Sequence, residues 1–184
     1  MSDSDRLPIT VRPATQDDLP RLVAFDHSYS TDYVWQMDRR EEENQINAIF
    51  RQVRLPRSVR VMYPREVESL TKTWSQRRLF IVAESRGEAH GYLGLMDGLI
   101  PHTGWITDLA VERRVRRQGL GTVLVTSAVH WARKAKLTRL IVETQSKNYP
   151  AICFCQKHGF TFCGYNDQHF ANQDIALFFG MSLK

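Results

Sequence analysis

The sequence predicts an α/β (α+β) fold in which helices flank a central, mostly antiparallel sheet of about six to seven strands. Short apolar or alternating runs recur along the chain, and two of them are separated only by a turn at residues 86–88, as in a hairpin. A long stretch of helical periodicity then separates later runs. The 184 residues suit one domain, and a hydrophobic content of 42% is sufficient for a packed core.

The beginning of the chain fits such a sheet. Residues 9–12 alternate between apolar and polar side chains, which predicts a short strand. Thr15 is followed by acidic residues, as is typical of a helix cap, and apolar side chains with helical spacing continue from Leu19 to Phe25. We therefore expect a strand followed by a short helix.

Residues 30–78 carry conflicting signals. The three glutamates at 41–43 resemble the start of a solvent-exposed helix. In contrast, Val59, Val61 and Tyr63 alternate with polar residues as in a strand. This segment is therefore expected to be the most variable part of the fold.

The patterns from residue 79 onward are sharper, and they indicate one α/β domain without repeats or linkers. Compact apolar or alternating runs predict strands at residues 79–83, 89–96, 103–111, 139–144, 160–165 and 175–183. Apolar side chains with helical spacing predict a helix at 119–134, and a proline tolerated in the first turn favours a shorter one at 150–157.

Charge and composition argue against several classes of protein. The formal net charge is +5, but no aromatic platform or recognition motif accompanies it, so nucleic-acid binding is not expected. No apolar run approaches the ~20 residues of a membrane span, and the acidic, polar residues 1–5 do not resemble a secretory signal. Three cysteines without metal-type spacing favour a reducing compartment. We expect a cytoplasmic protein with no membrane partner and no metal.

The most informative segment is an arginine-rich loop. Four arginines lie between residues 113 and 117, and Gly119 and Gly121 follow at the start of the predicted long helix. Backbone N–H groups at a helix start form a binding site for anions, which the helix dipole strengthens. Glycine lets the backbone approach a ligand closely, and arginine adds charge-assisted hydrogen bonds. These residues therefore predict a site for a diphosphate group.

Two common phosphate-binding motifs do not match this loop, since neither G-x-G-x-x-G nor G-x-x-x-x-G-K-[ST] is present. The pattern from Arg116 to Gly121 is R-x-x-G-x-G, and it resembles the pyrophosphate loop of the GNAT superfamily of acetyl-CoA-dependent N-acetyltransferases. The segment that begins at Asn148 is similar to a second signature of that superfamily, N-x-x-A-x-x-x-Y-x-x-x-G-F, with Cys155 in place of the tyrosine. The resemblance covers residues 79–184 and the first strand and helix.

This resemblance implies a single domain, 1–184, and a site for acetyl-CoA. Residues 30–78 would form a variable acceptor-side region and residues 79–184 the cofactor-binding core. The strand before the loop would offer its backbone to the pantetheine arm, the loop would hold the pyrophosphate, and Asn148 would lie near the thioester. The implied cofactor-binding residues are Leu109, Ala110, Val111, Arg116, Arg117, Gln118, Gly119, Leu120, Gly121, Thr122 and Asn148.

The implied reaction is attack of a primary amine on the thioester, which needs a base for the ammonium and an acid for the departing thiolate. Asp108 and Glu143 are the candidate bases, although either carboxylate could pair with a cation instead. Cys155 is the candidate acid, since a thiol with a pKa of about 8.5 would match the CoA thiol. A small buried residue is the other interpretation of Cys155. Tyr149 or Tyr165 could also supply the proton, or the thiolate could leave unassisted.

Several segments are also similar to streptothricin acetyltransferases, including residues 105–111, 143–145 and 170–178. This similarity implies an amine acceptor on a streptothricin-like antibiotic, with a peptide as the other acceptor class. A non-catalytic domain that binds or senses acyl-CoA is the alternative that the missing tyrosine permits. Dimers are common in the superfamily, so the resemblance adds a homodimer to the expectations.

Overall fold

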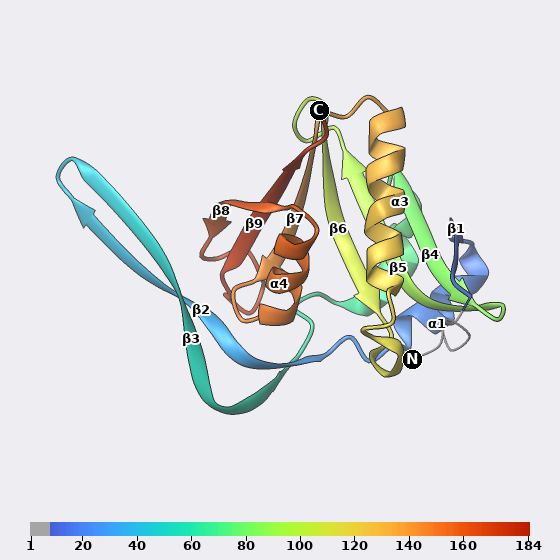
Figure 1. Ribbon diagram of the computed structural model, residues 1–184, viewed down its shortest axis with the longest axis horizontal. Coiled ribbons are helices and arrows are strands. Elements are labelled where there is room, and N and C mark those ends of the chain that lie inside the picture. Colours follow the sequence, from blue (N-terminus) through green and yellow to red (C-terminus); the bar gives the residue numbers. More distant parts are fainter. Residues whose placement is uncertain (1–7) are drawn as a thin grey trace.

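Residues 8–184 are described by a computed structural model, in which a seven-stranded sheet forms the centre of the molecule (Figure 1). The strands follow the order β1-β4-β5-β6-β7-β9-β8 across the sheet. All neighbouring pairs are antiparallel except β6 and β7, which run parallel. The predicted fold class, a mostly antiparallel sheet flanked by helices, is therefore confirmed.

The predicted strands of this sheet are present, with ends that differ by one or two residues from the sequence patterns. They are β1 (Thr10–Pro13), β4 (Leu79–Ser85), β5 (Glu88–Asp97), β6 (Thr103–Val111), β7 (Arg139–Gln145), β8 (Thr161–Asn166) and β9 (Ala176–Ser182). The α-helices are α1 (Leu19–Val23), α2 (Leu70–Thr73), α3 (Leu120–Lys134) and α4 (Tyr149–Lys157), and the 3-10 turns are η2 (Gln16–Asp18), η3 (Val67–Ser69), η4 (Trp74–Gln76) and η5 (Arg113–Val115).

Successive side chains of β4 point to opposite faces of the sheet, and each face has its own hydrophobic core. Ile81 and Ala83 belong to the larger cluster, which α3 covers with the fully buried Leu124 and Ala128. Phe80 and Val82 belong to the smaller cluster beneath α1 and α2. Successive strand residues point to opposite faces, so one apolar run supplies both cores. This explains why residues 79–83 are continuously apolar rather than alternating.

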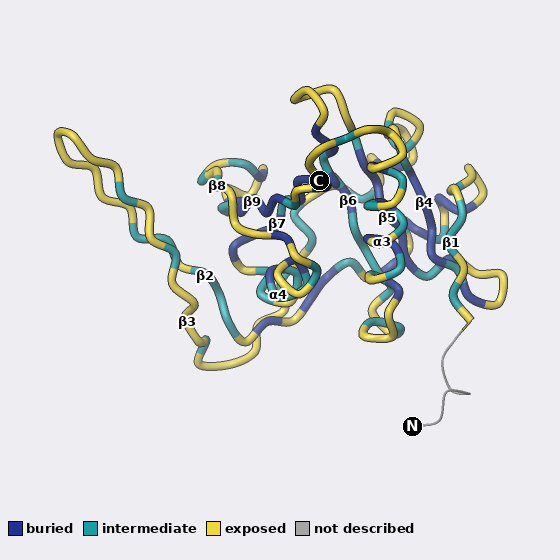
Figure 2. Tube along the Cα trace, turned by 45° about the horizontal axis from the view of Figure 1, so that its top comes forward, coloured by how far each residue is buried: buried dark blue, intermediate teal, exposed yellow. Residues whose placement is uncertain are grey.

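Residues 29–61 form a feature that the sequence only partly predicts. β2 (Tyr29–Glu42) and β3 (Gln45–Val61) pair as a long antiparallel hairpin, which we call the arm, and its outer half projects away from the sheet (Figures 1 and 2). The expected helix start at 41–43 is wrong, because these glutamates lie at the tip of the arm, where Glu42 pairs with Gln45. The strand predicted around Val59 and Val61 is confirmed as the end of β3.

Several predictions concern features other than the fold. The prediction about residues 1–5 lies outside the described part of the chain. Within residues 8–184, no helix has both the length and the apolar character needed to cross a bilayer. The cysteines Cys153, Cys155 and Cys163 are all free thiols. No group of three or more His, Cys, Asp or Glu side chains among the described residues is arranged to hold a metal ion.

Candidate functional site

The parallel strands β6 and β7 pair over only part of their length. Their register runs from Thr103 opposite Arg139 to Ile106 opposite Val142. β6 continues to Val111 and β7 to Gln145 without further pairing between them. The strands therefore separate, and β7 does not pair with the last residues of β6. A strand edge that no neighbouring strand pairs can hydrogen-bond to an extended ligand.

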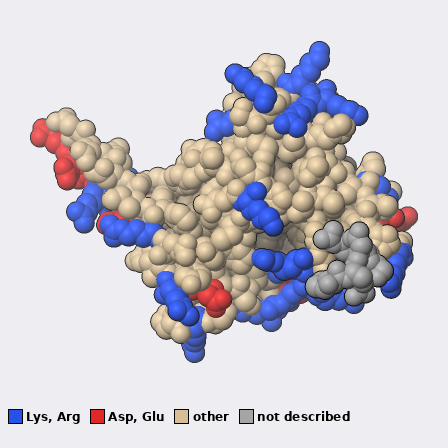
Figure 3. All heavy atoms as spheres, in the orientation of Figure 1, with Lys and Arg blue, Asp and Glu red and all other residues tan. Residues whose placement is uncertain are grey.

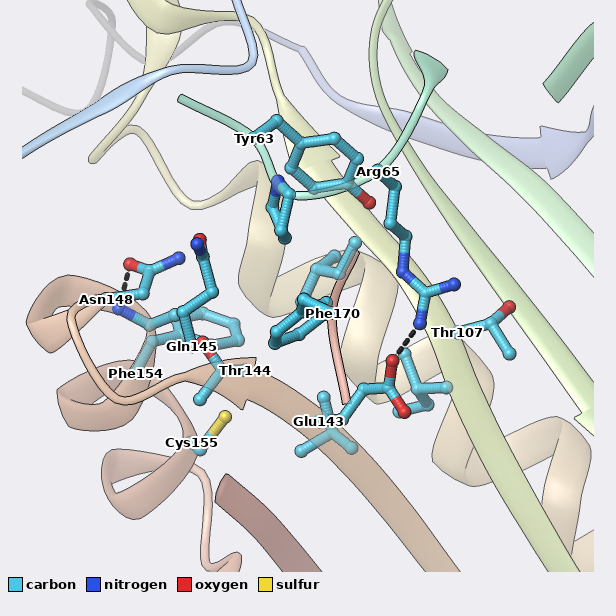
Figure 4. A pocket seen from close by; sticks show the side chains of 15 residues that line it. Tyr63, Arg65, Thr107, Glu143, Thr144, Gln145, Asn148, Phe154, Cys155 and Phe170 are labelled. Atoms are coloured by element: carbon cyan, nitrogen blue, oxygen red, sulfur yellow. Dashed lines mark hydrogen bonds and ion pairs between the residues drawn. The ribbon is translucent and has the colours of Figure 1, made fainter. Parts of the chain in front are cut away.

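A cavity of about 90 Å³ lies where the strands separate (Figure 4). Its walls come from the end of β6, the end of β7, the start of α4 and two loop segments that precede η3 and β9. It is lined by Tyr63, Pro64, Arg65, Ile106, Thr107, Leu109, Val142, Glu143, Thr144, Gln145, Asn148, Ala151, Phe154, Cys155 and Phe170. Of the three candidate catalytic residues, Glu143 and Cys155 line this cavity and Asp108 does not.

Glu143 presents a buried carboxylate to the cavity. Its side chain is only 6% exposed, and Oε2 accepts a hydrogen bond from the indole Nε1 of Trp105 at 3.0 Å. Oε1 pairs with the guanidinium of Arg65 (Figure 4), and it lies 3.1 Å from Nε2 of His169. Arg65 is 37% exposed, so it covers the carboxylate from the solvent side. A second cation that entered the cavity would meet this carboxylate.

Asp108, in contrast, forms a buried ion pair with Arg77. Its Oδ2 accepts from Nε of Arg77 at 2.6 Å and from the hydroxyl of Thr107 at 2.7 Å. The two charged side chains are 11% and 7% exposed, and Arg77 also donates to the carbonyl of Thr73 at 2.7 Å. A Cβ at Gly94 would lie 2.6–2.8 Å from this pair, so glycine leaves the space it needs. Pairing with an arginine, the alternative interpretation of Asp108, is what the structure shows.

Cys155 is a buried residue of α4 whose thiol reaches the cavity wall. It is 3% exposed, and burial raises the pKa of its thiol to about 12. Proton transfer from such a thiol to a thiolate of ordinary pKa, about 8.5, is uphill by about 5 kcal/mol. In the folded protein, the pKa of Cys155 therefore no longer matches that of the CoA thiol, which was the reason for proposing Cys155 as the acid.

The predicted phosphate loop joins β6 to α3 and curls sharply. Gly119 is the N-cap of α3 with φ of +95°, and Arg117 has φ of +69°, a region that residues with a side chain rarely occupy. No side chain caps the first turn of α3. The amides of Leu120, Gly121 and Thr122 therefore lack intrahelical or capping partners and point out of the helix start. Backbone curled in this way presents successive N–H groups to one anion.

The arginines of the loop have different positions. The Arg116 guanidinium donates to the carbonyls of Val111 at 2.9 Å, Ser28 at 2.7 Å and Asp26 at 2.9 Å. Its side chain thus fastens the loop to the segment before β2. Arg117 is exposed and remains available to an anion, as does its neighbour Gln118. Arg113 and Arg114 make ion pairs with Asp26 and Glu112 respectively.

The second signature lies at the start of α4, against the same cavity. Asn148 is the N-cap of α4, and its Oδ1 accepts from the amide of Ala151 at 3.1 Å, which leaves its NH₂ group for the cavity. Phe154, one turn further on, packs beside the start of α3. A Cβ at Gly121 would lie 3.2 and 3.3 Å from two atoms of the Phe154 ring, so Gly121 permits the close approach of the two helices.

Some cavity residues were missed at the level of sequence. Tyr63, Arg65 and Phe170 line the cavity, and His169 lies behind it, although no motif marks the first two. Phe170 belongs to a segment similar to streptothricin acetyltransferases, which was a signal for it. Tyr149 and Tyr165, the proposed substitutes for the acid, are elsewhere: Tyr149 packs on Tyr33 and Tyr165 on Phe50.

A polar network that includes the buried Gln145 and Asp174 adjoins the cavity. Gln145 at the end of β7 accepts from the Tyr29 hydroxyl at 2.8 Å and donates to Asp174 at 2.6 Å. Asn172 donates to the same carboxylate at 2.9 Å, and Lys147 pairs with it. Because every member has a partner, the network can fix β7 relative to β2 and the segment before β9.

This combination of fold, splayed strands and helix-start loop defines an acyltransferase-like site, and the comparison with known families agrees. The model of the acetyltransferase (GNAT) family matches residues 30–160. The chain therefore belongs to the acetyltransferase (GNAT) family.

Individual relatives give a finer comparison. Streptothricin acetyltransferase A of Bacillus subtilis (strain 168) is 34% identical over 77 residues, which are 40% of this chain and 44% of that protein. Streptothricin acetyltransferase of Streptomyces lavendulae is 29% identical over 92 residues, 47% of this chain and 46% of that protein. Each alignment thus spans less than half of the relative's length. The crystal structure of nourseothricin acetyltransferase superposes with a TM-score of 0.81 at 21% identity, over 96% of this chain and 99% of that chain, and shows the same fold.

Proposed function

We propose that this protein is a cytoplasmic N-acetyltransferase that transfers the acetyl group of acetyl-CoA to a primary amine of a cationic small molecule. The observation that carries the proposal is the joining of two features in one cleft. Uncapped amides at the start of α3 offer a diphosphate site. The gap between the ends of β6 and β7 connects this site to the buried carboxylate of Glu143. Streptothricin-class antibiotics are the acceptors that the named relatives suggest.

The residues present fit acetyl-CoA as the donor. The amides of the α3 first turn and the exposed Arg117 would hold the pyrophosphate, since both favour negative charge. The backbone from Leu109 to Val111, which β7 does not pair, would hydrogen-bond to the pantetheine arm through groups other than the Val111 carbonyl, which accepts from Arg116. The NH₂ group of Asn148 would lie near the thioester end. When bound, acetyl-CoA supplies the acetyl group as a thioester.

The chain must also convert the acceptor to a nucleophile. A lysine-like amine has a pKa of about 10.4, so nearly all of it is a cation at pH 7. Glu143 is the cavity carboxylate that can attract this cation and take its proton, directly or through a water molecule. To do so, it must exchange its contact with Arg65 for one with the acceptor. The backbone N–H of Leu109 would donate to the thioester carbonyl.

None of the three side chains proposed as the acid has both the pKa and the position needed to protonate the departing thiolate. Cys155 is too weak an acid after burial, and Tyr149 and Tyr165 lie away from the cavity. Tyr63 lines the cavity, but burial raises the pKa of its phenol. We therefore propose that the thiolate leaves unassisted and takes its proton from solvent.

The proposal is tested by incubating the purified chain with acetyl-CoA and a panel of amines that includes streptothricin, nourseothricin, polyamines and an N-terminal peptide. Release of CoA thiol and acetylation of the acceptor, followed by mass spectrometry, are expected for a cationic small molecule. Acetylation of the peptide alone would contradict the acceptor class. Tight binding of acetyl-CoA without turnover of any amine would instead favour a non-catalytic acyl-CoA-binding domain.

Replacing Gly121 by Trp is expected to abolish acetyl-CoA binding while the fold is retained. The new side chain would press on Phe154 and cover the amides that form the predicted pyrophosphate site. Isothermal titration calorimetry measures the binding, and circular dichroism measures the fold. The control is His130→Trp, an exposed position further along α3, which should bind normally. Unchanged binding by Gly121→Trp would show that the loop is assigned incorrectly.

Replacing Cys155 by Ala is expected to lower turnover less than tenfold. The thiol is neither exposed nor acidic enough to protonate the leaving group, so its loss removes packing rather than chemistry. Steady-state rates of CoA release measure the effect, with the exposed Cys163→Ala as the matched control. A loss on the order of 10³ at unchanged stability would make Cys155 an essential acid.

A further inference from the structure

The loop between β5 and β6 carries an exposed apolar pair. Of the eight large apolar side chains that are exposed within residues 8–184, only Leu99 and Ile100 are consecutive in the sequence, and they are 70% and 47% exposed. They lie at a tight turn in which the Thr103 amide donates to the Ile100 carbonyl at 3.2 Å. Pro101 occupies the second position of that turn and restricts its backbone. The pair is therefore held outward at the crest of a loop.

The same end of the molecule carries basic side chains. The His102 carbonyl accepts from the amides of Thr138 at 2.8 Å and Arg139 at 3.3 Å, so the β5–β6 loop is joined to the segment that connects α3 to β7. From the last turn of α3 to the first residue of β7, this segment has four exposed basic residues: Arg133, Lys134, Lys136 and Arg139. Figure 3 shows basic side chains gathered at this end, at the top of the view, with no acidic side chain among them on that face.

The positive charge at this end is not neutralised by the protein. Within residues 8–184, none of the four basic side chains forms an ion pair with an acidic one. Asp97, the acidic residue closest to the apolar pair in the sequence, pairs with Arg78 at 3.7 Å. Stabilisation of the helix dipole accounts for the two basic residues in the last turn of α3. It does not account for Lys136 and Arg139, which lie beyond the helix.

We propose that this end of the molecule docks on an anionic membrane surface, with Leu99 and Ile100 inserted among the lipid headgroups and the four basic side chains against the lipid phosphates. Apolar burial and charge attraction together give reversible binding at such an interface. A bilayer accepts a projecting apolar pair without a matching pocket, which a protein partner would have to provide. The expectation of no membrane partner rested on the lack of an apolar run of spanning length, and docking at the surface needs no such run.

Docking in this orientation leaves the proposed acetyl-CoA cleft open. β6 begins at Thr103, next to the apolar pair, and ends at Val111, where the predicted phosphate loop starts. A strand rises about 3.3 Å per residue, so the two ends of β6 are roughly 26 Å apart. The cleft lies where β6 and β7 separate, towards the far end of β6. The membrane proposal is therefore independent of the proposed acetyl transfer.

Sedimentation with lipid vesicles tests the proposal. The unmodified chain is expected to sediment with equimolar phosphatidylcholine and phosphatidylserine vesicles, and to stay in the supernatant with phosphatidylcholine alone. Raising NaCl from about 0.1 M to about 1 M should release it, because the Debye length falls from about 10 Å to about 3 Å. Failure to sediment with the anionic vesicles overturns the proposal, and so does binding to polyglutamate in place of those vesicles.

The apolar pair is tested by replacing both Leu99 and Ile100 with Ser. Loss of the inserted side chains is expected to lower the partition coefficient onto anionic vesicles by about tenfold or more. The matched control replaces Ile46 and Ile49 of the arm with Ser, since these side chains are equally exposed, at 71% and 46%. The control should bind as the unmodified chain does. Equal binding by the two double variants would contradict insertion of the pair and overturn the proposal.

Reversal of charge tests the basic side chains. Lys134→Glu combined with Lys136→Glu is expected to lower the same partition coefficient by more than about tenfold. The control combines Arg54→Glu with Arg57→Glu on the arm, which changes the net charge by the same amount and should have a smaller effect. All substituted positions are exposed, and circular dichroism checks that every variant folds. An equal or larger loss in the control would show that the chain binds through its net charge or through the arm, and would overturn the proposal.

Discussion

Turnover of the amine acceptor is expected to fall by about 10² to 10⁴-fold when Glu143 is replaced by Gln. Glu143 is the candidate base that faces the cavity, and glutamine has nearly the same shape but can neither attract the ammonium nor accept its proton. Binding of acetyl-CoA should persist, because the predicted pyrophosphate site lies at the start of α3 rather than on β7. Initial rates of CoA release and a separate titration with acetyl-CoA measure the two effects.

A matched carboxylate serves as the control. Glu112 is also part-buried and paired, with His90 at 2.7 Å and Arg114 at 2.6 Å, but it lies outside the cavity. Glu112→Gln should therefore retain turnover close to that of the unmodified chain. Equal rates for Glu143→Gln and the unmodified enzyme would show that Glu143 takes no part in the reaction and that its pairing with Arg65 is only a structural contact.

Replacing Asp108 by Ala is expected to lower the free energy of unfolding by about 3–5 kcal/mol. The variant would leave the buried guanidinium of Arg77, only 11% exposed, without its carboxylate partner. For a chain of this size, such a loss corresponds to a decrease in melting temperature of roughly 10 °C. Denaturant unfolding and thermal melts followed by circular dichroism measure it.

The same pair offers a control that separates stability from catalysis. Replacing both Asp108 and Arg77 by Leu removes the two charges together and should recover part of the lost stability, since no unpaired charge remains. Turnover per folded molecule should remain within tenfold of the unmodified chain in both variants. A thousandfold loss of turnover at unchanged stability would instead identify Asp108 as the base.

Elements with a regular apolar pattern could be predicted because the pattern reports burial directly. β4 to β7, β8, β9 and α3 lie within one or two residues of their expected positions. Of the arm, only the end of β3 around Val59 and Val61 was predicted, because the exposed strands bury no regular face and the glutamates at 41–43 are equally compatible with a helix start and a hairpin tip. The loop before α3 was recognisable because its glycines and arginines are close together in the sequence, whereas its attachment to Ser28 and Asp26 through Arg116 was not visible there.

The roles of the acidic residues required the three-dimensional structure. Asp108 and Glu143 look alike in the sequence, since each follows a β-type apolar run. Their partners lie far away along the chain: Arg77 is 31 residues from Asp108, and Arg65 is 78 residues from Glu143. Local patterns in the sequence were sufficient to indicate the family, the helix-start loop and most of the sheet. Which carboxylate faces the cleft and which is neutralised in the core depends on long-range packing, because the charge environment of a buried group is set by neighbours that only folding brings together.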